Sequence, residues 1–199
     1  MVNMLKLNSY AKINLTLDIL KKLDSGYHEI NSIMQTISLH DTLSFKESAE
    51  VIVRCYGIEQ EKNIAYKTAM LLKERYGIHD GIEIIIEKEI PIGAGLGGGS
   101  SNAAATLLAL NKLWDLNLSQ SELEYLAMQL GADVTFFLNG GTCFASGMGD
   151  KVKKIRELPY LDLLLVYPNI NISTKQAYSS IEYFLVGKKQ SSVRLLNDL

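Results

Sequence analysis

Cysteine is scarce in this sequence, with two residues, Cys55 and Cys143, in a chain of 199. Two thiols so far apart do not indicate a disulfide framework, and we expect both to be free and buried in a reducing compartment. No apolar run is long enough to cross a bilayer, and the first residues lack the continuous apolar core and the cleavage site of a signal peptide. These absences predict a cytoplasmic protein without a membrane partner.

A strong charge of either sign is also missing, because 20 Lys and Arg residues face 22 Asp and Glu residues. The formal net charge of −2 gives no sign of a nucleic-acid surface, so we expect no nucleic-acid partner. There is no internal repeat and no low-complexity linker. The length therefore allows one large domain or one and a half small ones.

Glycine, in contrast, is concentrated in the stretch PIGAGLGGGSSN at residues 91–102. Five glycines fall within seven positions, at 93, 95, 97, 98 and 99. An apolar, β-branched segment at 82–90 precedes the stretch, and a strong helix-forming segment at about 100–114 follows it. Glycine lets backbone N–H groups turn toward a ligand, and a helix N-terminus adds free N–H groups and a positive dipole end. The stretch therefore predicts a loop that binds phosphate.

Three other interpretations of this loop are weaker. A Walker A loop ends in GK[ST], but residues 99–101 read GSS. Gly93, Gly95 and Gly98 match a dinucleotide fingerprint, but the next segment reads as a helix instead of a strand that ends in an acid. A glycine-rich turn without a ligand is disfavoured because each glycine costs conformational entropy on folding.

The remainder of the chain alternates between strand and helix patterns. Apolar–polar alternation predicts strands over 4–20, near 43–45, over 50–56 and over 82–90. Helical spacing predicts helices over 62–76, about 100–114, 119–131 and after Thr174. Asn63 and Gly77 suit the two ends of the first helix, and Ser119 with Glu122 forms a capping-box pattern.

Two apolar runs, 134–138 and 161–167, are expected to be buried strands. The first is followed by Asn139-Gly140-Gly141, a hairpin signal, and by a returning strand over 142–145. The second is expected to end at Pro168.

Four segments together resemble the GHMP kinase superfamily. They are AKINL at 11–15, DSGYHEI at 24–30, PIGAGLGGGSSNAA at 91–104 and GADVTFF at 131–137. The glycine motif alone indicates the superfamily, whereas AKINL with DSGYH indicates the branch that phosphorylates a hydroxyl of 4-diphosphocytidyl-2-C-methyl-D-erythritol in non-mevalonate isoprenoid precursor biosynthesis. The resemblance covers nearly the whole chain. It implies an α+β fold, a GHMP-kinase-type N-terminal lobe with a mixed β-sheet packed by helices.

The resemblance also implies roles for individual residues. The catalytic positions are Lys12 and Asp133. The ATP-binding positions are Pro91, Ile92, Gly93, Ala94, Gly95, Leu96, Gly97, Gly98, Gly99, Ser100 and Ser101 around the phosphates, with Asn63, Ile64 and Lys88 around the adenine. The positions that hold the cytidine diphosphate methylerythritol substrate are Asn14, Tyr27, His28 and Thr174.

The implied chemistry is phosphoryl transfer from ATP, with Mg²⁺ bridging the phosphate oxygens near Ser100 and without fixed protein ligands for the metal. Asp133 would accept the proton of the substrate hydroxyl, and Lys12 would keep Asp133 ionised and stabilise developing charge. Taken without the resemblance, Lys12 is equally a solvated strand lysine, and Asp133 is equally a surface acid at a helix end.

The sequence departs from the family pattern at two places. Thr135 stands where the family commonly has proline after GADV, beside the candidate base. Family members also continue into a second lobe with another glycine-rich motif, so we expect residues 1–165 to form the ATP-binding lobe and 166–199 to begin a truncated second lobe. Exposed apolar residues there, such as Leu195 and Leu196, would support self-association.

Two alternative functions follow from that second departure and from the breadth of the superfamily. One is a nucleotide-binding fragment without catalysis, and the other is a GHMP kinase for a different small alcohol.

Overall fold

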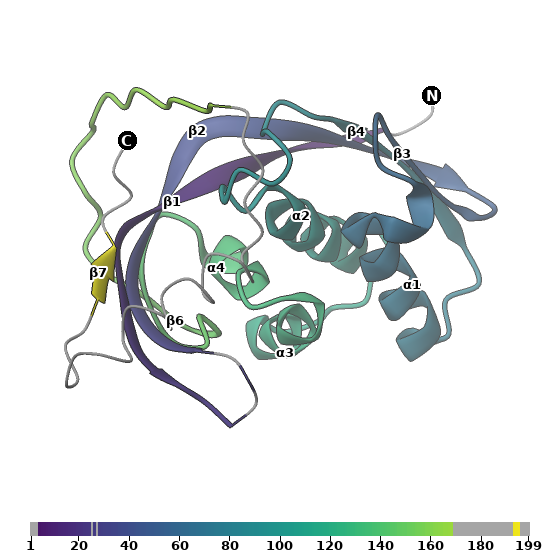
Figure 1. Ribbon diagram of the computed structural model, residues 1–199. Coiled ribbons are helices and arrows are strands. Elements are labelled where there is room, and N and C mark those ends of the chain that lie inside the picture. Colours follow the sequence, from purple (N-terminus) through teal and green to yellow (C-terminus); the bar gives the residue numbers. More distant parts are fainter. Residues whose placement is uncertain (1–3, 25, 27, 169–192, 196–199) are drawn as a thin grey trace.

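The computed structural model describes residues 4–24, 26, 28–168 and 193–195 (Figure 1). Its strands are β1 Leu5–Lys22, β2 His28–Ser48, β3 Val51–Cys55, β4 Gly81–Glu87, β5 Thr142–Gly147, β6 Lys151–Lys154 and β7 Val193–Leu195. Its helices are the 3₁₀-helix η1 Gln60–Lys62 and the α-helices α1 Ile64–Tyr76, α2 Gly98–Leu113, α3 Gln120–Leu130 and α4 Val134–Asn139. Tyr27, Thr174, the helix predicted after Thr174, and Leu196 lie outside the described residues.

One sheet, built on the long antiparallel pair β1 and β2, forms the frame of the molecule. The strand order is β3-β4-β2-β1-β7, and β5 pairs with both β2 and β6. The β3–β4 pair is parallel and is joined through α1, whereas the other pairs are antiparallel. In Figure 1 the β1–β2 pair curves around the four α-helices. This mixed sheet packed by helices confirms the α+β fold class.

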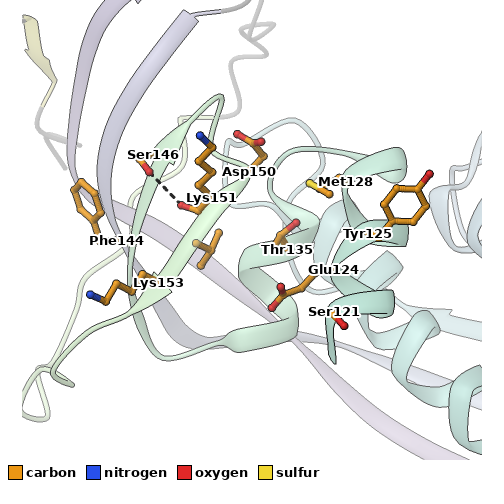
Figure 2. Close-up of a pocket in the computed structure, with 11 residues that line it drawn as sticks. Ser121, Glu124, Tyr125, Met128, Thr135, Phe144, Ser146, Asp150, Lys151 and Lys153 are labelled. Atoms are coloured by element: carbon orange, nitrogen blue, oxygen red, sulfur yellow. Dashed lines mark hydrogen bonds between the residues drawn. The ribbon is translucent and has the colours of Figure 1, made fainter. Parts of the chain in front are cut away.

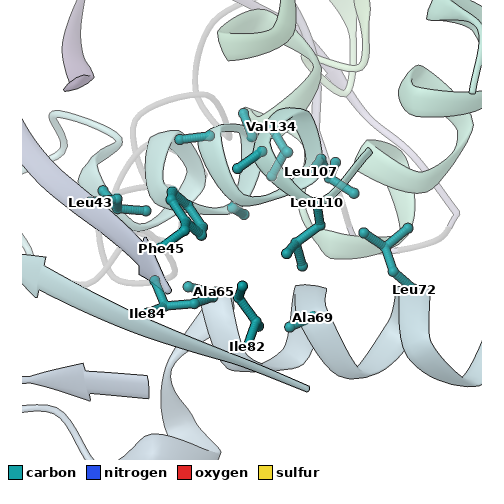
Figure 3. Packing of buried hydrophobic residues seen from close by; sticks show 14 of the residues in the cluster. Leu43, Phe45, Ala65, Ala69, Leu72, Ile82, Ile84, Leu107, Leu110 and Val134 are labelled. Atoms are coloured by element: carbon teal, nitrogen blue, oxygen red, sulfur yellow. The ribbon is translucent and has the colours of Figure 1, made fainter. Parts of the chain in front are cut away.

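The main hydrophobic core lies between the sheet and the helices (Figure 3). Strands β2 and β4 contribute Leu43, Phe45, Ile82 and Ile84, and the helices contribute Ala65, Ala69, Leu72, Leu107, Leu110 and Val134. Burying each large side chain of this kind contributes about 1.5–3 kcal/mol. Nine residues of α2 are buried, many of them alanine, so this helix sits close against its neighbours. The core therefore fixes α2, and with it the end of the glycine-rich loop.

Local sequence signals set the helix ends where they were predicted. The Asn63 side chain accepts a hydrogen bond from the Ala65 N–H at 2.9 Å, and Gly77 ends α1 in the left-handed conformation at φ 64°. Ser119 and Glu122 form the reciprocal capping box of α3. The strands predicted over 4–20, 50–56 and 82–90 correspond to β1, β3 and β4, and the segment near 43–45 belongs to the longer β2.

The strand predicted over residues 134–138 is wrong, because this run forms helix α4. A short apolar run does not distinguish a buried strand from a buried helix. Here Val134 and Phe136 are fully buried in two different core clusters. The hairpin predicted at 139–141 is also wrong: Gly140 ends α4, and β5 pairs with β2 and β6.

The buried strand predicted over residues 161–167 is also wrong. Residues 161–168 form no regular structure, and Leu161, Leu163, Leu164 and Val166 are exposed. A strand needs a paired neighbour for its backbone groups, and no strand in the described part of the chain pairs with this segment. Only Leu165 packs on a small cluster, which contains Ala11, Ile90 and Leu96.

Both cysteines are free, as the sequence predicted. The prediction that both are buried is confirmed for Cys143 and wrong for Cys55, which is half-buried. Within residues 4–24, 26, 28–168 and 193–195, no helix is both long enough and apolar enough to cross a membrane.

Candidate active site

The glycine-rich loop joins the end of β4 to the start of α2, as its sequence predicted. Gly93, Gly95 and Gly97 have φ values of 75°, 73° and 72°, in the left-handed region that favours glycine. Gly97 is also restricted by space, because a Cβ atom there would lie 2.6 Å from Cζ of Phe137 and 3.1 Å from Cγ of Lys12. The loop therefore packs directly against the predicted catalytic lysine.

The N-terminus of α2 is open toward the loop. Its N-cap residue, Gly97, has no side chain that could bond the first N–H groups of the helix. Gly99 is exposed and Ser100 is half-buried, whereas Ser101 is 3% exposed and its hydroxyl lies 2.7 Å from that of Ser9. Of the two predicted serines, Ser100 is thus the one that an anion at this helix end can reach.

Lys12 is a buried residue of β1, with 7% of its surface exposed, so it is not a solvated strand lysine. The β1–β2 register shifts between Tyr10 and Lys12, and the Lys12 N–H bonds the Leu96 carbonyl of the loop at 3.0 Å. Its ammonium group donates to Oδ1 of Asn14 at 2.6 Å. Asn14 in turn donates to Ser32 at 2.7 Å, so a buried polar chain orients the lysine.

Asp133 lies at the start of α4 and faces the same space. Its Oδ2 is 3.7 Å from Nζ of Lys12, and its side chain is 39% exposed. It makes no capping hydrogen bond to α4, so the carboxylate is open to a hydroxyl group. The structure therefore brings together two residues that are far apart in the sequence and that the resemblance paired.

Two of the three predicted adenine residues, Ile64 and Lys88, lie beside the start of α2. Ile64 and Lys88 lie 3.6 Å and 3.0 Å from the positions of Cβ atoms built on Gly99 and Gly98. Asn63 is buried and caps α1. The predictions missed Cys55, a half-buried residue of β3 whose thiol lies near Lys88. Burial raises the pKa of its thiol above the ordinary value, and the nearby Lys88 opposes that shift.

The predictions also missed Asp41, whose carboxylate pairs with the ammonium group of Lys88. Asp41 is fully buried on β2, in the middle of the sheet. A charged residue in an otherwise apolar strand pattern was the available signal, since a buried charge requires a partner.

Asn14 and His28, the two predicted substrate residues within the described chain, are well separated. Asn14 pairs with Met34, and His28 begins β2 opposite Lys22. The step from residue 34 to residue 28 is six residues, or roughly 20 Å of extended strand, although the curvature of β2 shortens the direct path. A single ligand that followed the strand from one residue to the other would be elongated.

A cavity of about 500 Å³ lies between α3, α4 and the β5–β6 pair (Figure 2). Its lining includes Tyr125, Thr135 and Lys151 but none of the predicted catalytic or loop residues. Thr135, which replaces the proline of the family pattern, is buried, and no partner for its hydroxyl is found among the described residues. Nor do these residues contain a group of three or more His, Cys, Asp or Glu side chains that could hold a metal ion.

Comparisons with known proteins agree with this geometry. The model of the GHMP kinases N terminal domain matches residues 63–141. The 4-diphosphocytidyl-2-C-methyl-D-erythritol kinase of Caldicellulosiruptor saccharolyticus is 46% identical, over 94% of this chain and 66% of that protein. The protein of the same name from Clostridioides difficile is 41% identical, over 100% of this chain and 69% of that protein.

Solved structures give the same picture. A crystal structure of 4-(cytidine 5'-diphospho)-2C-methyl-D-erythritol kinase is 35% identical with a TM-score of 0.74, over 89% of this chain and 64% of that one. A mevalonate kinase with 19% identity and a TM-score of 0.57 shares the fold. Across the curated relatives of the same name, the chain spans 61% to 69% of the relative's own length.

Proposed function

This chain belongs to the GHMP kinase family, and we propose that it carries the ATP-binding lobe and the catalytic pair of a small-molecule kinase. The acceptor is a hydroxyl group of 4-diphosphocytidyl-2-C-methyl-D-erythritol, and the reaction is a step of non-mevalonate isoprenoid precursor biosynthesis in the cytoplasm. Residues 1–165 form the ATP-binding lobe, and 166–199 begin a second lobe. The approach of Asp133 to Lys12 beside the glycine-rich loop is the single observation that carries the proposal.

ATP binds with its phosphates along residues 91–101 and against the open N-terminus of α2. The left-handed glycines and the uncapped helix end fit an anionic ligand, because both present backbone N–H groups to it. Ser100 is placed to approach the phosphates together with Mg²⁺, which neutralises their negative charge when it is bound. Asn63, Ile64 and Lys88 lie on the adenine side.

Asp133 accepts the proton of the substrate hydroxyl as the phosphoryl group is transferred. Its exposed carboxylate can approach that hydroxyl, and it lies 3.7 Å from the buried ammonium group of Lys12, whose aliphatic stem packs against Gly97 of the loop. A fixed positive charge at this place stabilises the negative charge that develops during transfer. Asn14 orients the lysine by accepting its hydrogen bond.

The second substrate extends along the β1–β2 pair from Asn14 toward His28. The roughly 20 Å of strand between these positions suits a nucleoside diphosphate joined to a polyol better than a compact alcohol. Tyr27 and Thr174 are assigned to this substrate by the resemblance alone.

The proposal is tested by a turnover assay with ATP, Mg²⁺ and the cytidine-linked substrate. The same assay is run on the 199-residue chain, on a version extended to the length of its relatives, and with mevalonate and homoserine as competing alcohols. Transfer to the cytidine-linked substrate at a higher kcat/KM than to either competitor supports the proposal. Nucleotide binding without transfer by either version would instead favour a non-catalytic nucleotide-binding module. Preferred transfer to mevalonate or homoserine would show that the proposed acceptor is wrong.

A further inference from the structure

Two buried polar residues that the proposed chemistry does not use lie directly opposite each other in the sheet. They are Ser9 of β1 and Asp41 of β2. Opposite residues of an antiparallel pair share one face of the sheet. The next pair, Tyr10 and His40, lies on the other face, where the two rings are 5.3 Å apart. Ser9 and Asp41 therefore both face the layer that contains α2 and the glycine-rich loop.

Asp41 holds the entrance of the loop. Its Oδ1 accepts hydrogen bonds from the backbone N–H groups of Glu89 and Ile90, both at 2.9 Å. Its Oδ2 accepts from the ammonium group of Lys88 at 2.5 Å. A fully buried carboxylate is stable only when it is paired and hydrogen-bonded in this way. All three donors immediately precede Pro91, so one side chain fixes the point at which the loop begins.

Ser9 holds the exit of the loop. Its Oγ lies 2.7 Å from both Oγ of Ser101 and Oδ1 of Asn102, the fourth and fifth residues of α2. A hydroxyl group has one proton, and the amide oxygen of Asn102 only accepts. Ser9 therefore donates to Asn102 and accepts from Ser101, which commits the Ser101 proton to this contact.

We infer that Ser9 and Asp41 are positioning residues that hold the two ends of the phosphate loop from one pair of opposite positions on β1 and β2. A third bond, from the Lys12 N–H to the Leu96 carbonyl, holds the middle of the loop. A loop fixed at three points has little conformational entropy left to lose when a ligand binds, so its affinity for that ligand is higher. That the ligand is ATP rests on the proposed function.

The variants that test this role are Ser9→Ala and Asp41→Asn. The first removes both hydroxyl contacts at the exit. The second keeps an oxygen for the two backbone N–H groups but loses the charge that pairs with Lys88. Ser119→Ala is the control, because it also removes a hydroxyl that hydrogen-bonds two residues, Ser121 and Glu122, but lies at the cap of α3.

Hydrogen exchange without any ligand tests the anchoring itself. We expect Ser9→Ala and Asp41→Asn to accelerate exchange of the amides between 89 and 99 at least about fivefold, the effect of one lost hydrogen bond. Ser119→Ala should leave these amides unchanged while lowering Tm. Equal loop exchange in all three variants would overturn the inference, whether or not ATP binds.

Calorimetric titrations then separate positioning from general stability. ATP affinity should fall about 5- to 30-fold in both loop variants at a temperature well below Tm, while affinity for the cytidine-linked substrate stays within about twofold. If the two loop variants lowered Tm but left the ratio of ATP affinity to substrate affinity unchanged, their role would be structural. That result would overturn the inference. If the unaltered chain binds no ATP, the proposed function fails, and the exchange experiment alone decides whether the anchors exist.

Discussion

The glycine-rich loop and the Lys12–Asp133 pair, the two halves of the candidate site, are held in different ways. The loop is fixed by buried contacts to β1 and β2, while Gly95 and Gly99 within it are exposed. In the pair, Lys12 is buried and bonded at 2.6 Å to Asn14, but it is 3.7 Å from Asp133, whose side chain is more than one-third exposed.

This difference suggests separate roles for the two halves of the candidate site. Under the proposed function, the loop is held in place before ATP binds, and the carboxylate of Asp133 is left open for the acceptor hydroxyl. Changes in the loop should therefore affect ATP affinity, and changes in the pair should affect the rate of transfer.

The largest effects are expected from the proposed catalytic pair. Asp133→Asn and Lys12→Ala should each lower kcat by about 10²–10⁴-fold, the usual contribution of general acid–base catalysis. The double variant should lose far less than the product of the two losses, because residues that act as a unit are not additive. Steady-state assays of the three variants provide the check. Losses that simply multiply would show that the two residues act independently.

Two glycines of the loop have the same backbone conformation but differ in the room that they leave for a side chain. Gly95 and Gly97 have nearly equal φ values, but a Cβ at Gly95 meets no atom within 4 Å, whereas one at Gly97 meets Phe137 at 2.6 Å. Gly97→Ala should lower ATP affinity roughly 100-fold, whereas Gly95→Ala should cost only about 1–2 kcal/mol of backbone strain, roughly 5- to 30-fold.

Circular dichroism of both glycine variants checks that the fold persists, and titration calorimetry gives their ATP affinities. Equal losses at the two positions would mean that the contact with Phe137 and Lys12 has no part in shaping the loop.

A smaller effect is expected from Asn14→Ala. This change removes the acceptor at 2.6 Å from the Lys12 ammonium group, and a hydrogen bond to a charged group of this kind supports about a tenfold loss in kcat. ATP affinity should stay within about twofold, and KM for the cytidine-linked substrate should rise. A variant that weakens ATP binding while kcat is unchanged would place Asn14 in the loop half of the site.

The smallest effect on turnover is expected at Cys55, which serves as a reporter of the adenine side. Burial raises the pKa of its thiol, so at each pH below that pKa it holds less thiolate than a free cysteine. Its alkylation by iodoacetamide should therefore be slower than that of free cysteine at pH 7 and should still be rising above pH 9.

ATP should slow the alkylation of Cys55, and Cys55→Ser should leave kcat within about twofold of the unaltered chain. Cys143, whose pKa burial also raises, should react only on unfolding. Faster reaction of Cys55 than of free cysteine at neutral pH would contradict the assigned environment.

Local signals explain why much of the fold was predictable from the sequence. The caps at Asn63, Gly77 and Ser119 act within a few residues, so their patterns set the helix ends directly. The run 134–138 was misassigned because hydrophobicity indicates burial but does not decide between a helix and a strand when only five residues are available. Residues 161–168 were misassigned because strand formation depends on a neighbour that the segment itself does not encode.

The site was predictable only where a motif carried it. Lys12, Asp133 and the glycine-rich loop stand in motifs, and the fold brings them into contact. Asp41 and Ser9 were missed because their partners lie 48 and 93 residues away in the sequence, and only the pairing of β1 with β2 aligns them with the loop.

The proposed separation between the glycine-rich loop, which binds ATP, and the Lys12–Asp133 pair, which promotes transfer, is tested most directly by measuring both ATP affinity and kcat of Asp133→Asn. The substitution keeps the size of the side chain but removes its ability to accept a proton. ATP affinity should remain within about twofold of the unaltered chain while kcat falls by about 10²–10⁴-fold. A near-normal kcat would remove Asp133 from the mechanism, and a parallel loss of ATP affinity would show that the two halves are not separate.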